Sequence, residues 1–216
     1  MLLLNEASGF QRVFAPFRKA TIVRQKVSAE HETKTSEPRW DVERYQNQHS
    51  FVWKHGSSLI ELANPKEGER ILDVGCGTGE LTQQLALHAS GAAVTGMDAD
   101  ANMVAKAQEQ YPDLHFFQGD IRTFKVPEDS KVDMLFSNAA LHWIPRADLE
   151  QAVASMAHAM KPGGRIVVEF GGKGNVDLIV KSMQIVLREK HGVDFDCPWN
   201  FPSVSAFTVL LEKQGI

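Results

Sequence analysis

Short apolar segments alternate with helix-like segments along the chain from residue 71 to its end. The apolar segments, each bounded by polar or turn residues, predict five buried strands, at residues 71–74, 92–97, 114–118, 132–137 and 165–170. Apolar residues at helical spacing predict helices at residues 80–88, 101–110, 148–160, 176–190 and 203–213. This alternation predicts an α/β fold whose parallel sheet is covered by helices on both faces.

The first 66 residues follow a different pattern and divide into two parts. Residues 39–66 carry apolar positions at helical spacing with a break near Gly56, which predicts two short helices. Residues 1–38 hold no acid between Glu6 and Glu30, but several arginines and lysines lie there among apolar residues. Such an arm is typical either of a mitochondrial targeting segment or of a poorly ordered tail, and we favour the tail. The main domain then occupies residues 67–216.

The composition narrows the class of protein. A chain of 216 residues is long enough for one sizeable core, and its net charge of −4 is that of an ordinary globular protein. No basic run is present, so we expect neither nucleic acid nor an anionic membrane as a partner. No segment is apolar for long enough to span a bilayer. The two cysteines, Cys76 and Cys197, indicate a reduced intracellular protein, and we expect the cytoplasm, with a mitochondrial location still open.

Residues with useful chemistry follow the predicted strands. Gly75 comes after the first strand, Asp98 after the second, Asp120 after the third and Asn138 after the fourth. In parallel sheets covered on both faces, ligands bind outside the carboxyl ends of the strands. We therefore expect these four residues to meet at one ligand site.

The glycine loop, Gly75-Cys76-Gly77-Thr78-Gly79, indicates what that ligand carries. It is one residue shorter than a dinucleotide fingerprint, and Glu80 would place negative charge where a pyrophosphate would lie. Asp73 precedes the loop and suits an ammonium group. Asp98 lies 19 residues after Gly79, close to the spacing at which an acid binds ribose hydroxyls. A ribose, an amine and no phosphate describe S-adenosylmethionine, with a nicotinamide cofactor as the poorer alternative.

An ordered set of motifs resembles the class I S-adenosylmethionine-dependent methyltransferases. The motifs are ILDVGCGTGELT, VTGMDADANMVAKA, FFQGDI, FSNAALHWI, MKPGGRIVVEF and FGGKGN, and the branch is that of trans-aconitate methyltransferases and malonyl-carrier-protein methyl ester synthases. The resemblance implies a doubly wound Rossmann-like sheet with five parallel strands in the order 3-2-1-4-5. It also implies that an N-terminal helical lid with Trp40, Tyr45 and Ser50 covers the site, so Tyr45 is expected to contact substrate.

The resemblance also implies roles for the cofactor-site residues. The methionine end would be held by Asp73 and the loop of Gly75, Cys76, Gly77 and Gly79. The ribose would bind Asp98, and the adenine would lie against Met103. The adenine amino group would donate to Asp120, beside the backbone N–H of Ile121, and Asn138 would line the sulfonium.

Three residues are candidates for the substrate side. His142 is the candidate base for a hydroxyl substrate, although a packed imidazole explains it equally well. Trp143 is expected to form an apolar wall. Lys173, in a glycine-rich segment after the fifth strand, is expected to bind a substrate carboxylate, although such a segment is also typical of a surface turn. We find no metal-ligand spacing and expect no metal.

The chain ends where relatives carry two further strands, so we expect the sixth and seventh strands to be missing and the fifth strand to be an exposed edge. The expected function is methylation of a small molecule, most simply at a carboxylate oxygen. The alternative is a catalytically impaired protein that binds S-adenosylmethionine. The sequence does not predict the oligomeric state.

Overall fold

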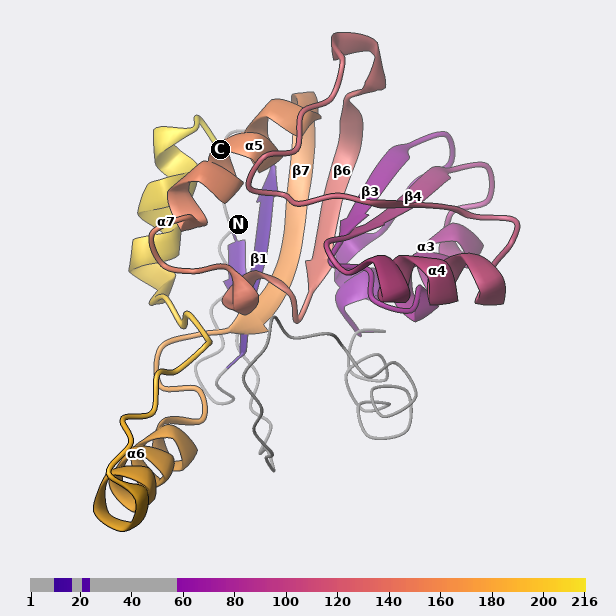
Figure 1. Ribbon diagram of the computed structural model, residues 1–216. Coiled ribbons are helices and arrows are strands. Elements are labelled where there is room, and N and C mark those ends of the chain that lie inside the picture. The colour runs from indigo at the N-terminus through magenta and orange to yellow at the C-terminus, as the bar shows by residue number, and fades with distance from the viewer. Residues whose placement is uncertain (1–9, 17–20, 24–57) are drawn as a thin grey trace.

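The computed structural model describes residues 10–16, 21–23 and 58–216, which form one sheet with helices on both faces (Figure 1). Its strands are β1 (Phe10–Pro16), β2 (Thr21–Val23), β3 (Arg70–Val74), β4 (Ala93–Asp98), β5 (His115–Gln118), β6 (Val132–Asn138) and β7 (Met160–Gly171). The α-helices are α3 (Glu80–His88), α4 (Ala101–Gln110), α5 (Leu149–Ala159), α6 (Asp177–His191) and α7 (Val204–Lys213), and residues 58–63 are also helical. Two 3-10 turns are η1 (Glu128–Ser130) and η2 (Leu141–Trp143).

The parallel part of the sheet confirms the predicted strand order. Strands β5, β4, β3, β6 and β7 are neighbours in that sequence and run parallel. Numbered along the chain, they give the order 3-2-1-4-5. The order reverses between β3 and β6, and the predicted site residues follow the carboxyl ends of the strands, where open parallel sheets bind their ligands.

The other end of the sheet corrects two expectations. Strand β7 is not an edge, because β1 pairs with it antiparallel from Phe10 opposite Gly171 to Pro16 opposite Arg165. Strand β2 then pairs antiparallel with β1. Two strands from the arm that we expected to be poorly ordered therefore cover this edge, whereas no strand follows β7 among the described residues, as expected. The physical reason is that the edge of β7 carries unpaired backbone groups, which a strand from anywhere in the chain can satisfy.

Apolar side chains cover the sheet on both faces. One cluster joins Leu72 and Val74 of β3 to helices α5 and α7. The other joins Ile71 of the same strand to α3 and to the helical residues 58–63. Leu59 and Ile60 are fully buried there, so this segment belongs to the core and not to the expected lid. The remainder of the expected lid, residues 39–57, lies outside the described residues.

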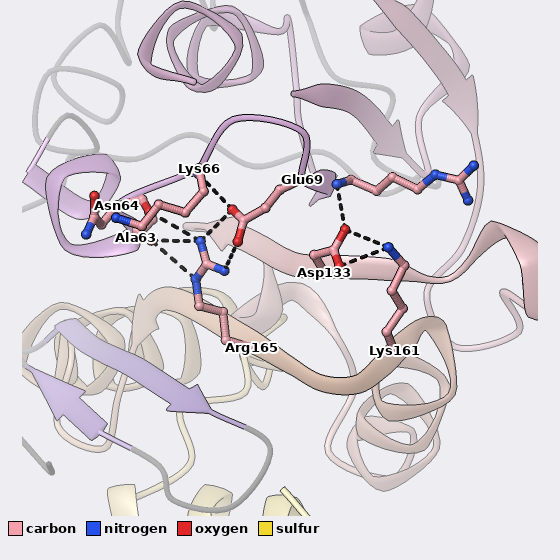
Figure 2. Close-up of polar contacts among 8 residues, drawn as sticks. Ala63, Asn64, Lys66, Glu69, Asp133, Lys161 and Arg165 are labelled. Atoms are coloured by element: carbon pink, nitrogen blue, oxygen red, sulfur yellow. Dashed lines mark hydrogen bonds and ion pairs between the residues drawn. The ribbon is translucent and has the colours of Figure 1, made fainter. Parts of the chain in front are cut away.

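A polar network ties the amino-terminal ends of the central strands together (Figure 2). Arg165 of β7 forms an ion pair with Glu69 at 2.5 Å and donates to the Ala63 carbonyl at 3.1 Å. Asp133 accepts from the Arg70 backbone N–H and from Lys161, both at 2.8 Å. Burial acts to raise the pKa of Glu69, but its hydrogen bonds to Arg165 and Lys66 lower it overall. This network holds the end of the sheet that is remote from the glycine loop.

Helix α6 lies apart from the sheet (Figure 1) and contributes no buried residue. Among the described residues, no helix has both the length and the hydrophobicity that a membrane span needs.

Candidate active site

The glycine loop follows β3, and backbone hydrogen bonds attach it to the end of β4. The N–H groups of Gly75 and Cys76 donate to the Met97 carbonyl at 2.8 and 3.1 Å. The N–H of Gly77 donates to Asp98 Oδ2 at 2.9 Å. The loop and the acid that were predicted to share a ligand are therefore in direct contact.

Two glycines of the loop are required by geometry. Gly75 has a φ of 73°, and a Cβ there would lie 2.2 Å from the Cβ of Ala140. Gly79 has a φ of 89°, and a Cβ there would lie 2.9 Å from the Phe116 ring. Both positions combine a left-handed backbone with no room for a side chain. The loop is thus packed between β5 and the turn after β6, and only glycine fits at either position.

Cys76 is part of the packing of the loop. Its side chain is buried in a cluster with Ala107 and Phe116. Burial raises the pKa of its thiol, so the thiolate is disfavoured and the residue acts as a small apolar group.

Asp73 is a buried carboxylate, whereas Asp98 is partly exposed. Asp73 is 2% exposed, and its Oδ2 accepts from Thr82 Oγ1 at 2.7 Å. Burial raises the pKa of Asp73 to about 7, and the negative charge of Asp98 adds to the shift. Burial also raises the pKa of Asp98, although the N–H groups of Asp100 and Gly77 oppose the shift.

The chemistry of these two acids fits S-adenosylmethionine. No ion pair formed by either acid is found among the described residues, so a ligand with positive charge would supply the missing partner. Asp98 keeps acceptor capacity beyond its two N–H partners, which suits ribose hydroxyls. A pyrophosphate does not fit here, because Glu80 begins α3 directly after the loop and accepts from Thr78 Oγ1 at 2.7 Å.

Helix α4 begins at the same edge of the sheet. Asp100 caps the helix by accepting from the N–H groups of Asn102 and Met103, at 2.7 and 3.3 Å. Met103, in the first turn of the helix, is only 2% exposed. This cap fixes Met103 next to the Asp98 segment.

Asp120 is held by Arg122, a residue that the motifs did not single out. Its carboxylate accepts four hydrogen bonds from Arg122, one from the backbone N–H and three from the guanidinium. Arg122 also pairs with Asp148 at 2.9 Å. The Arg122 hydrogen bonds lower the pKa of Asp120. A carboxylate has about four acceptor positions, so an adenine amino group could bind Asp120 only if Arg122 released one.

Two other predicted cofactor residues lie close to the strand ends. Ile121 is 6% exposed and packs into the cluster that contains Met97. Asn138 is the last residue of β6, is 9% exposed, and stands opposite Glu169 of β7. The turn after Asn138 has Ala139 at a φ of 55° and brings Ala140 against Gly75.

His142 lies in η2, at the ends of β6 and β7. Its Nδ1 accepts from the Gly171 N–H at 3.4 Å, and its ring lies 5.6 Å from Trp143 and 5.8 Å from Phe201. Burial lowers the pKa of His142 to about 4. The imidazole is therefore neutral at pH 7. With Nδ1 used as an acceptor, its proton is on Nε2.

Trp143, which was predicted to form an apolar wall, lies among other aromatic side chains. Trp143 is 37% exposed and meets Trp199 edge to face, with ring centroids 5.8 Å apart. Trp199 and Phe201 belong to the loop before α7. A backbone hydrogen bond joins this loop to η2, because the Asn200 N–H donates to the His142 carbonyl at 2.8 Å. This aromatic cluster borders His142.

Lys173 lies in the turn between β7 and α6. Its side chain is exposed, and its backbone N–H donates to the Pro202 carbonyl at 3.0 Å. It lines a cavity together with Arg146 and Asn200. Tyr45, Trp40 and Ser50 lie outside the described residues. Within the described residues, no group of His, Cys, Asp or Glu side chains is arranged to hold a metal ion.

Comparison with known proteins identifies the family. Residues 71–164 match the methyltransferase domain family. The chain is 32% identical over 187 residues to the uncharacterized methyltransferase C70.08c of Schizosaccharomyces pombe, covering 83% of this chain and 71% of that one. It is 36% identical over 131 residues to a trans-aconitate 2-methyltransferase of Deinococcus radiodurans, and the match covers 60% of this chain and 48% of that one. The chain thus spans about half of that curated relative.

A solved structure shows the same fold. The phosphoethanolamine N-methyltransferase 2 of Haemonchus contortus, in complex with S-adenosyl-L-methionine, matches with a TM-score of 0.60 and 22% identity. The match covers 76% of this chain and 36% of that one. The fold, the edge of the sheet at which the glycine loop meets Asp98, and these relatives agree: the chain belongs to the class I methyltransferases, and its cofactor is S-adenosyl-L-methionine.

Proposed function

We propose that this protein methylates a small organic acid at a carboxylate oxygen. The observation that carries the proposal is the state of His142, the one candidate base that we identified at the strand ends. Its pKa of about 4 and its occupied Nδ1 make it a poor proton acceptor at neutral pH. A carboxylate is already ionised at that pH and needs no base, whereas a hydroxyl does.

The cofactor contacts belong to the same proposal. Asp73 balances the ammonium group, the backbone from Gly75 to Gly79 follows the methionine end, and Asp98 binds the ribose hydroxyls. Met103 and Ile121 border the adenine. Asp120 accepts a hydrogen bond from the adenine amino group, which replaces one of its hydrogen bonds from Arg122. Asn138 lies beside the sulfonium. When bound, S-adenosyl-L-methionine supplies an electrophilic methyl group.

On the substrate side, the chain mainly orients the acceptor and excludes water. The aromatic cluster around Trp143 provides an apolar wall that shields a reacting carboxylate from solvent. The Nε2–H of His142 is a neutral donor that can hold one carboxylate oxygen while the other reacts. The Deinococcus relative is named as a trans-aconitate methyltransferase, which supports an acid as the acceptor.

The test is a transfer assay with the full chain. S-adenosylmethionine with a labelled methyl group is incubated with a panel of di- and tricarboxylic acids and with phenols. We expect label in at least one acid and none in the phenols, with the transfer lost in Asp98→Ala. Label in the phenols alone would overturn the carboxylate assignment.

A further inference from the structure

A cavity of about 520 Å³ lies between the segment after η2, the first turn of α5 and the start of α7. Arg146, Glu150, Lys173, Asn200 and Ser203 supply its polar lining, and Phe201 and Leu210 are among its apolar residues. A volume of this size is within the range of small-molecule sites. None of these lining residues belongs to the set that is proposed to bind the cofactor.

The lining carries excess positive charge. Arg146 and Lys173 are both exposed, and neither forms an ion pair with another described residue. Glu150 also lines the cavity, but Lys213 pairs with its carboxylate at 2.9 Å. Two cations therefore face a space in which the neighbouring acid is already neutralised.

A hydrogen-bond donor in the same lining is left without a partner. The Nδ2 atom of Asn200 is buried and makes no hydrogen bond with the described residues. Buried amide nitrogens are nearly always paired, and a rotation of the Asn200 side chain would turn Nδ2 toward an acceptor in the cavity that it lines. Helix α7 begins beside this cavity, with Ser203 as its N-cap. The amino-terminal end of a helix favours a nearby negative charge.

The cavity is connected to the proposed methyl-transfer centre through its own wall. The Phe201 ring lies 5.8 Å from the His142 ring, and the Asn200 N–H donates to the His142 carbonyl. A ligand that fills the cavity thus contacts the residues that fix His142.

We propose that this cavity binds a second, non-reacting carboxylate of the methyl acceptor, held by Arg146, Lys173 and the side-chain amide of Asn200. This inference rests on the proposed function and makes the acceptor a di- or tricarboxylic acid and not a simple monocarboxylic acid. The apolar residues of the cavity suit the carbon chain between the carboxylates. Binding a part of the acceptor that does not react can position the part that does.

The experiment measures binding without the cofactor. The full chain is titrated calorimetrically with propane-1,2,3-tricarboxylate, with acetate and with inorganic phosphate. We expect the tricarboxylate to bind at least tenfold more tightly than acetate or phosphate. Arg146→Gln and Lys173→Gln should each weaken it about tenfold, and Asn200→Leu should weaken it as well. Lys190→Gln, an exposed lysine on α6 with the same change of charge, is the control and should bind like the unmodified chain.

Each other outcome has a definite meaning. Equal weakening in Lys190→Gln, or no weakening in Arg146→Gln and Lys173→Gln, overturns the proposed site. Tighter binding of phosphate with the same dependence on Arg146 and Lys173 overturns the carboxylate assignment in favour of a phosphoryl group. Site-dependent tricarboxylate binding without methyl transfer to any acid leaves the cavity standing and contradicts the proposed function. If Arg146→Gln and Lys173→Gln both transfer methyl groups with an unchanged KM for the acid, the proposed function stands and the proposed cavity site is contradicted.

Discussion

The Asp98 carboxylate accepts a hydrogen bond from the Gly77 backbone N–H at 2.9 Å, which joins the end of β4 to the glycine loop after β3. Its other oxygen accepts from the Asp100 N–H, also at 2.9 Å. The acid proposed to bind ribose therefore also holds the loop proposed to follow the methionine end. A change at Asp98 should disturb both parts of the cofactor site.

Replacement of Asp98 by alanine should weaken the binding of S-adenosylhomocysteine by about 1–3 kcal/mol. The variant removes the ribose acceptor and leaves two backbone donors to find other partners. Calorimetric titration of the full chain measures the loss. Asp113→Ala, at an exposed position before β5, is the control and should bind normally. Binding by Asp98→Ala with unchanged affinity would remove Asp98 from the site.

The affinity for S-adenosylhomocysteine should rise with pH between about 6 and 8. The pKa of Asp73 is raised to about 7, so the acid is partly protonated in the free protein at pH 7. An ammonium group favours the ionised form, so binding releases a proton below that pKa, and the affinity gains at most about tenfold per pH unit there. Titrations in buffers of different ionisation enthalpy measure the proton release.

The same titrations with Asp73→Asn provide the control for this prediction. The amide cannot ionise, so its affinity should be lower and nearly independent of pH over this range. If the unmodified chain shows a flat affinity and releases no proton, the ammonium group is not placed against Asp73.

Replacement of Gly75 by alanine should lower the free energy of unfolding by about 1–3 kcal/mol, because the new Cβ meets Ala140 and the backbone is left-handed. Gly68→Ala separates the two causes. Gly68 has a φ of 75° but no atom within 4 Å of the place where a Cβ would lie, so it measures the backbone cost alone. Denaturant unfolding should show the larger loss for Gly75→Ala, and adding Ala140→Gly should restore part of it. Equal losses in the two single variants would mean that the loop does not contact Ala140.

At saturating cofactor, the rate of methyl transfer should be flat between pH 6 and 8. The pKa of His142 is lowered to about 4, so the imidazole does not titrate in this range. His142→Ala should lose only positioning, much less than the roughly 10²–10⁴-fold that removal of a general base causes. The pH profile of kcat measures this. A limb that rises with a midpoint near 6.5, the ordinary pKa of histidine, and vanishes in His142→Ala would instead indicate a hydroxyl acceptor.

The parallel half of the sheet could be predicted from the sequence because each strand is marked locally. Residues 71–74 and 132–137, for example, are apolar runs that end in a glycine loop or a polar turn. The pairing of Phe10–Pro16 with β7 could not be predicted, because it joins segments that are distant in sequence and depends on a free edge that no local pattern reveals. Within the predicted lid, residues 39–66, the burial of residues 58–63 could not be predicted either, because helical spacing does not specify which surface buries the apolar face.

The candidate site divides in the same way. Asp73, Gly77 and Asp98 could be placed together because strand ends share one edge of the sheet. The pairing of Arg122 with Asp120 carried a signal, a basic residue two positions after the acid, that we did not use. No sequence signal indicated that Thr82 pairs with Asp73 or that a cavity lies around Asn200, because both features depend on side chains from separate elements.

The most direct test of the proposed function is the chemical nature of the methylated product. After transfer from labelled S-adenosylmethionine to a tricarboxylic acid by the full chain, the product is treated with mild alkali. A methyl ester releases its label as volatile methanol, whereas methyl ethers and methylamines keep it. We predict alkali-labile label that Asp98→Ala does not form. Label that is transferred but stays bound after alkali would contradict methylation at a carboxylate oxygen.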